Sequence, residues 1–168
     1  MNKRLHFALV PFLVLFTLSA ANGGSVWRAP RPDDLGRESE WRAKDVNRYL
    51  LVRGDFDGDG NEDVARLLIN DEDDEIGFFV AMGASKTPPL LLQTIPDKRM
   101  LEVLGIGLAR PGTYATACGK GYWKCDKGEP ARARLENPGI DFFAYGKGSS
   151  FFIWNAGTKK FDEVLMSD

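Results

Sequence analysis

Histidine is almost absent from this sequence. The only one is His6, and without it a chain has no Ser-His-Asp or Cys-His catalytic arrangement and no histidine-bearing zinc site. Basic residues are also in the minority, with 22 Lys and Arg against 24 Asp and Glu. A mildly acidic surface argues against nucleic acid as a partner.

Long apolar runs are missing as well. The longest, residues 7–18, contains Pro11 and is short against the roughly 20 residues that span a bilayer. Basic residues precede it and small residues follow it, which is the layout of a secretory signal peptide over residues 1–21, cleaved after Ala21. An N-terminal membrane anchor is the alternative. Cleavage would remove His6 and leave 20 basic and 24 acidic residues, which is a net charge of −4. We therefore expect a periplasmic or secreted protein with no membrane span after cleavage.

Cysteine is scarce too: Cys118 and Cys125 are the two in the chain. Two thiols make a poor structural zinc site, and their spacing does not match the C-x-x-C redox motif. In an exported protein we expect a disulfide. It would close the loop "CGKGYWKC" and hold Tyr122 and Trp123 at its rim, either as a simple staple or as a rigid aromatic recognition loop.

The rest of the sequence has the pattern of short strands and turns. We expect one mainly β, antiparallel domain with no β-α-β alternation. Residues 22–47 form an extended or irregular N-terminal segment, and 48–168 form the β-rich domain. One short helix is expected within 38–50. The expected strands lie at 48–52, 64–69, 76–82, 90–95 and 101–109, followed by three within 140–166 that "GKGS" and "NAGTK" separate.

The stretch "RGDFDGDGNEDVA", residues 53–65, carries the strongest chemical signal. Asp55, Asp57, Asp59, Asn61 and Asp63 alternate with other residues, so a tightly coiled loop can aim their oxygens inward. Calcium takes 6–8 oxygen ligands at 2.3–2.6 Å, including a backbone carbonyl such as that of Asn61. Without a cation, so many neighbouring carboxylates repel one another. The alternative is an empty, solvated acidic turn.

Two known calcium loops share this pattern. The EF-hand requires glutamate at loop position 12, where this chain has Arg66, and it is flanked by helices rather than by strands. The stretch resembles the FG-GAP or VCBS-type repeat of integrin-like β-propellers more closely, through Gly54, the four aspartates, Gly58 and Gly60. That resemblance covers about residues 49–69 and implies a calcium ion in a β-hairpin loop. A propeller needs several such blades and only one copy is found, so no propeller is expected.

Enzymatic readings find less support in these residues. "DFDGD" also resembles the D-x-D-G-[TV] motif of aspartate-nucleophile phosphatases, but Asp59 replaces the threonine or valine and the doubly wound fold is missing. A hydrolase with two carboxylates stays open, although nothing singles out a pair. We therefore expect a protein that is not an enzyme.

A run of five acids, Asp71–Glu75, follows the loop. It is either a solvated hairpin turn or a negative patch for a basic partner. Candidate partner-binding residues are Asp71, Asp73, Asp74, Tyr122 and Trp123.

The mature chain as a whole is also similar to exported bacterial proteins with a comparable aspartate loop, cysteine loop and final hairpin (Trp154, Phe161, Ser167, Asp168). We expect an exported calcium-binding domain of binding or structural type. The alternative is a periplasmic inhibitor or immunity protein that docks a cell-envelope enzyme, with calcium purely structural.

Overall fold

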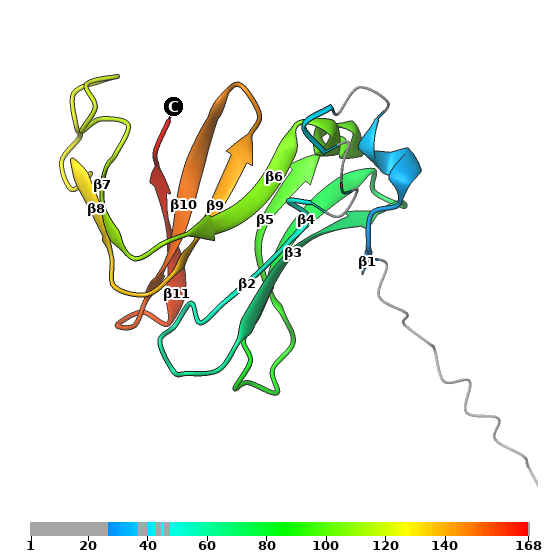
Figure 1. Cartoon of the computed structure of the whole chain (residues 1–168), viewed down its shortest axis with the longest axis horizontal. Coiled ribbons are helices and arrows are strands. Elements are labelled where there is room, and N and C mark those ends of the chain that lie inside the picture. The colour runs from blue at the N-terminus through cyan, green and yellow to red at the C-terminus, as the bar shows by residue number, and fades with distance from the viewer. Residues whose placement is uncertain (1–26, 37–39, 43–44, 46–47, 168) are drawn as a thin grey trace, which may run out of the picture.

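Antiparallel strands make up most of the structure. The computed structural model describes residues 27–36, 40–42, 45 and 48–167 (Figure 1). Its strands and 3-10 helices are β1 (Trp27–Arg28), η1 (Pro32–Leu35), η2 (Glu40–Arg42), β2 (Leu51–Gly54), β3 (Asp63–Asn70), β4 (Glu75–Ala81), β5 (Leu90–Pro96), η3 (Lys98–Glu102), β6 (Leu104–Ala109), β7 (Gly112–Ala115), β8 (Arg132–Leu135), β9 (Gly139–Ala144), β10 (Gly148–Asn155) and β11 (Lys160–Leu165).

β3 organises the first sheet. β4 pairs along one edge of it and β5 follows, while β1 and β2 pair with its two ends. Apolar and other residues alternate along β3, so that Ala65, Leu67 and Ile69 face the core. This register places the start of β3, Asp63, opposite Gly54 at the end of β2. The two residues therefore close the hairpin that carries the aspartate loop.

The second sheet has the order β11-β10-β9-β6 and packs its apolar face on the first sheet. Aromatic rings make the contact between the sheets. Phe78 of β4 lies 5.3 Å from Phe142 of β9 and 5.0 Å from Phe152 of β10, measured between ring centroids. Phe56, from the aspartate loop, joins the same core and is 1% exposed. The loop is therefore anchored in the main core by an apolar side chain.

β7 and β8 form a separate two-stranded ribbon, which lies beyond the second sheet in Figure 1. A smaller apolar cluster forms there, and its buried members are Ala109, Ala133, Leu135, Phe151 and Met166. Because side chains alternate along a strand, β10 can serve both cores: Phe152 faces the first sheet and Phe151 faces the ribbon.

The expectation of a mainly β, antiparallel single domain without a propeller is confirmed. Most expected strands are present with bounds shifted by a few residues. In place of a strand from 101, residues 98–102 form η3, and β6 begins at Leu104. The sequence patterns missed β7 and β8, which are only four residues each.

The structure describes only part of the N-terminal region, so it tests only some of the predictions made for residues 1–47. The predicted signal peptide, residues 1–21, lies outside the described residues. Within 22–47, β1 joins the first sheet. Of the short helix expected within 38–50, the described residues 40–42, 45 and 48–50 show the 3-10 turn η2. No helix in the described part of the chain has the length and apolar character needed to cross a bilayer.

Candidate metal site in the β2–β3 loop

The β2–β3 loop is wound by hydrogen bonds from its own backbone to its own aspartates. Asp55 Oδ1 accepts the N–H of Gly58 at 2.8 Å, and its Oδ2 accepts the N–H of Gly60 at 3.0 Å. Both glycines have positive φ, 77° and 85°, a conformation that other residues rarely adopt. The alternation of aspartate and glycine therefore sets the curvature of the loop as well as its charge.

Asp63 ties this loop to the rest of the sheet. The residue is 0% exposed, Oδ2 accepts the N–H of Phe56 at 2.8 Å, and Oδ1 accepts the N–H of Gly83 at 2.8 Å. Gly83 follows β4, twenty residues away. A Cβ on Gly83 would lie 2.2 Å from the carbonyl oxygen of Glu62, so only glycine fits there. The sequence pattern indicated Asp63 as a ligand but did not indicate this structural role.

Three of the predicted ligands converge. Asp55, Asp57 and Asp63 each offer a carboxylate oxygen within 4.8 Å of the others. Asp59 lies outside this group: its Oδ1 accepts the backbone N–H of Asn61 at 2.7 Å and the side-chain amide of Asn61 at 3.1 Å. The structure therefore brings together three of the four predicted aspartates and leaves Asp59 bonded within the loop.

The electrostatics of the group are those of a site that favours a positive charge. Partial burial raises the pKa of Asp57, and the neighbouring charges of Asp63, Asp59 and Asp55 raise it further. Two like charges 4 Å apart repel by about 1 kcal/mol in water and about 4 kcal/mol at an effective dielectric constant of 20. A bound cation would reverse the sign of this interaction. Carboxylate oxygens are the ligands that a hard cation such as calcium prefers, so the residues fit the predicted ion.

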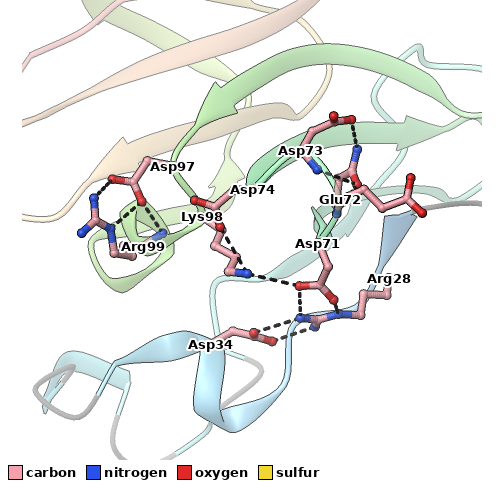
Figure 2. Close-up of polar contacts among 10 residues, drawn as sticks. Arg28, Asp34, Asp71, Glu72, Asp73, Asp74, Asp97, Lys98 and Arg99 are labelled. Carbon is pink, nitrogen blue, oxygen red and sulfur yellow. Dashed lines mark hydrogen bonds and ion pairs between the residues drawn. The ribbon is translucent and has the colours of Figure 1, made fainter.

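The acidic run at 71–75 occupies the β3–β4 turn, and Figure 2 shows that two of its charges, Asp71 and Asp74, are paired with basic side chains. Asp71 accepts from Arg28 Nη2 at 2.8 Å, and the guanidinium also donates to Asp34 at 2.7 and 3.0 Å. Lys98 Nζ lies 3.4 Å from Asp71 and 3.2 Å from Asp74. These bonds, that from Arg28 first, lower the pKa of Asp71 to about 2.

Asp73 also has a local partner, because its Oδ2 accepts the side-chain amide of Asn70 at 2.6 Å. The run is therefore built into the fold as a turn and as an anchor for the N-terminal segment. Arg28 and Lys98 lie 43 and 27 residues from Asp71, so no local sequence pattern could have indicated these pairs.

Cys118 and Cys125 form the expected disulfide, with their Cα atoms 4.9 Å apart. The loop they close keeps Tyr122 55% exposed and Trp123 42% exposed. The indole N–H of Trp123 donates to the carboxylate of Glu129 at 3.1 Å, which orients the ring at the surface. A disulfide-bonded pair fits an oxidising compartment.

The comparisons with family models, curated proteins and solved structures return no match for this chain. The likeness of the β2–β3 loop to the FG-GAP or VCBS-type repeat stays a resemblance carried by residues 49–69. Chemically, the loop offers three convergent carboxylates in a frame of backbone hydrogen bonds.

Proposed function

We propose that this protein is an exported calcium-binding domain of binding or structural type, with the ion held by Asp55, Asp57 and Asp63. The observation that carries the proposal is the convergence of these three carboxylates in a loop wound by backbone N–H groups. Because the loop is already ordered in the folded protein, binding of the ion there loses less conformational entropy than binding to the unfolded chain would.

Export is part of the proposal. The N-terminal layout of a signal peptide and the Cys118–Cys125 disulfide support a periplasmic or secreted location. Calcium is more abundant outside the cytosol, and extracellular modules bind it with dissociation constants of about 10⁻⁴ to 10⁻³ M. A site with only three carboxylates in an exported protein is suited to that range.

Thermal unfolding with calcium and with chelator tests the proposal. Saturation at 100 times the dissociation constant should add about 2.7 kcal/mol to the free energy of unfolding. Magnesium should add much less, because it demands octahedral geometry and sheds its water reluctantly. Asp57→Ala should abolish the response, while Asp73→Ala, in the acidic run, should leave it intact. Identical melting in calcium and in chelator, with no heat of binding at millimolar calcium, would show that the loop is only an acidic turn.

A second candidate function is the docking of a partner enzyme through the disulfide loop, with calcium purely structural. Its support is the exposure of Tyr122 and Trp123 on a loop that a covalent bond closes, since rigid aromatic side chains often anchor interfaces. A cell-envelope enzyme that co-purifies with the native protein and is lost from Trp123→Ala would support it. Equal recovery with both forms would count against it.

A further inference from the structure

A cleft of about 430 Å³ opens beside the β2–β3 loop. Its walls come from three connections that are distant in sequence: the β2–β3 loop, the stretch between β8 and β9, and the β10–β11 hairpin. The β2–β3 loop and the β10–β11 hairpin both lie toward the lower side of Figure 1. Sites for small molecules commonly have volumes of about 300–1,000 Å³, so the cleft is large enough to hold one.

Side-chain packing holds the three walls together. Asn137 lies against Gly58, so that a Cβ on this glycine would be 2.4 Å from Asn137 Nδ2. Phe161 contacts both Phe56 of the β2–β3 loop and Trp154 of β10, with ring centroids 6.3 and 5.2 Å apart. The stretch between β8 and β9 and the β10–β11 hairpin are therefore both packed against the β2–β3 loop, and the cleft is a surface feature with braced walls.

Hydrogen bonds also fix the hairpin wall. Asn155 Oδ1 accepts the N–H groups of Gly157 and Thr158 at 3.0 and 3.1 Å, which shapes the turn. The amide of Asn155 donates to Asp162 Oδ2 at 2.8 Å across the hairpin. These bonds hold Asn155 and Asp162, two of the polar groups of the lining, in fixed positions.

The chemistry of the lining selects a class of ligand. Trp154 supplies an aromatic ring, and an aromatic ring can pack on the C–H face of a sugar. The carboxylates of Asp57, Glu136 and Asp162 accept hydrogen bonds from hydroxyl groups, and the Asn137 amide can both donate and accept. The lining has three acidic residues and one basic residue, Arg134, so its net negative charge disfavours a phosphate or another anion.

We propose that this cleft binds a short neutral saccharide, with Trp154 packed on a sugar ring and the acidic and amide side chains bonded to its hydroxyl groups. The saccharide would be a second ligand of the protein, besides the proposed calcium ion. Asp57 belongs both to the cleft and to the carboxylate group of the loop, so the saccharide and the cation sites are neighbours.

Nuclear magnetic resonance titration of the mature protein in calcium tests this inference. The probes are the neutral trisaccharides maltotriose, cellotriose, chitotriose, mannotriose and galactotriose, with trilysine and tripolyphosphate as charged comparisons. At least one trisaccharide should shift the Trp154 indole and Asn137 amide signals saturably below 10 mM, more strongly than either charged probe. No saturable shift by any of the five, or tighter binding of a charged probe at the same signals, would overturn it.

Variants place the ligand in the cleft. Trp154→Ala should weaken trisaccharide binding at least tenfold, while Trp154→Phe, which keeps an aromatic ring against Phe161, should stay within about threefold. Because Trp154 also packs on Phe161, Glu136→Gln provides a second variant on the exposed rim and should weaken binding several-fold. Glu163→Gln on β11, outside the cleft, is the matched control and should bind like the native protein. Native affinity in both Trp154→Ala and Glu136→Gln would assign the saccharide to another surface.

Discussion

Asp63 accepts the backbone N–H of Gly83 through Oδ1, at 2.8 Å, while its Oδ2 accepts that of Phe56 at the same distance. The carboxylate thus joins the aspartate loop to the segment that follows β4. Because the residue is buried, water cannot replace either bond if the carboxylate is lost. Asp63 is therefore a structural residue of the hairpin whether or not a cation is bound.

Replacement of Asp63 by alanine should destabilise the protein even in chelator. It would leave two backbone N–H groups without their acceptor, and a buried unsatisfied group costs about 1–3 kcal/mol. We expect the free energy of unfolding to fall by about 2–4 kcal/mol. Urea unfolding in the presence of chelator measures this loss directly.

Asp59→Ala is the matched control, because the Asp59 carboxylate bonds only within the exposed part of the loop. It should change the free energy of unfolding in chelator by less than about 0.5 kcal/mol. If Asp59→Ala and Asp63→Ala destabilise the chelated protein equally, the structural role assigned to Asp63 is wrong.

The contrast between these two aspartates shows how far the sequence could be interpreted. Spacing alone predicted a calcium loop between two strands, and β2 and β3 do flank it. Spacing treats Asp59 and Asp63 alike, since each is simply an acid at an odd loop position. Their difference depends on Gly83, which reaches Asp63 only through the pairing of β3 with β4. Such non-local contacts also hid the partners of Asp71.

The pH dependence of stability should expose the crowding around Asp57. Burial and the neighbouring carboxylates raise its pKa in the folded protein, so in chelator the folded state binds a proton more tightly than the unfolded chain does. Stability is therefore lost as pH rises from the ordinary aspartate pKa, about 3.9, through the raised one. Asp57→Asn, which removes the charge, should melt higher than the native protein at pH 7 and equally at about pH 3.

Calcium should reverse the order of the melting temperatures of the native protein and Asp57→Asn. At pH 7 the native protein should gain stability from the ion and Asp57→Asn should gain little, because the variant lacks one of the three carboxylates that we propose as ligands. Melting curves at both pH values, each with calcium and with chelator, provide the full comparison. A native protein that melts above Asp57→Asn in chelator at pH 7 would contradict the repulsion argument.

Reduction of the Cys118–Cys125 disulfide should lower stability without changing the fold. The bond closes a loop of eight residues, and the chain-entropy model assigns such a loop about 2–3 kcal/mol. The double variant Cys118→Ser/Cys125→Ser should unfold at correspondingly lower urea concentration and no longer respond to reductant. Thiol labelling of unreduced, denatured native protein should find no free thiol; two labelled thiols per chain would show that the bond does not form in the cell.

Low pH should break the ion pairs of Arg28 with Asp34 and Asp71. Arg28 lowers the pKa of both carboxyl groups, that of Asp71 to about 2. A lowered pKa in the folded state contributes stability above the unfolded value, about 3.9, and that stability is lost as pH falls toward 2. Arg28→Met should therefore lower the melting temperature clearly at pH 6 and much less at pH 2, where Asp71 is partly protonated.

Arg53→Met separates this anchor from an ordinary surface ion pair. Arg53 Nη1 lies 2.7 Å from Glu62 Oε1, as close as Arg28 lies to Asp34, but its side chain is 54% exposed against 22% for Arg28. Exposed pairs contribute about 0–1 kcal/mol because water and salt screen them. Arg53→Met should therefore move the melting temperature little at either pH. If both variants lose the same amount at pH 6, the Arg28 pairs are no more than surface contacts, and β1 is held to β3 by its backbone pairing and the packing of Trp27 on Phe79.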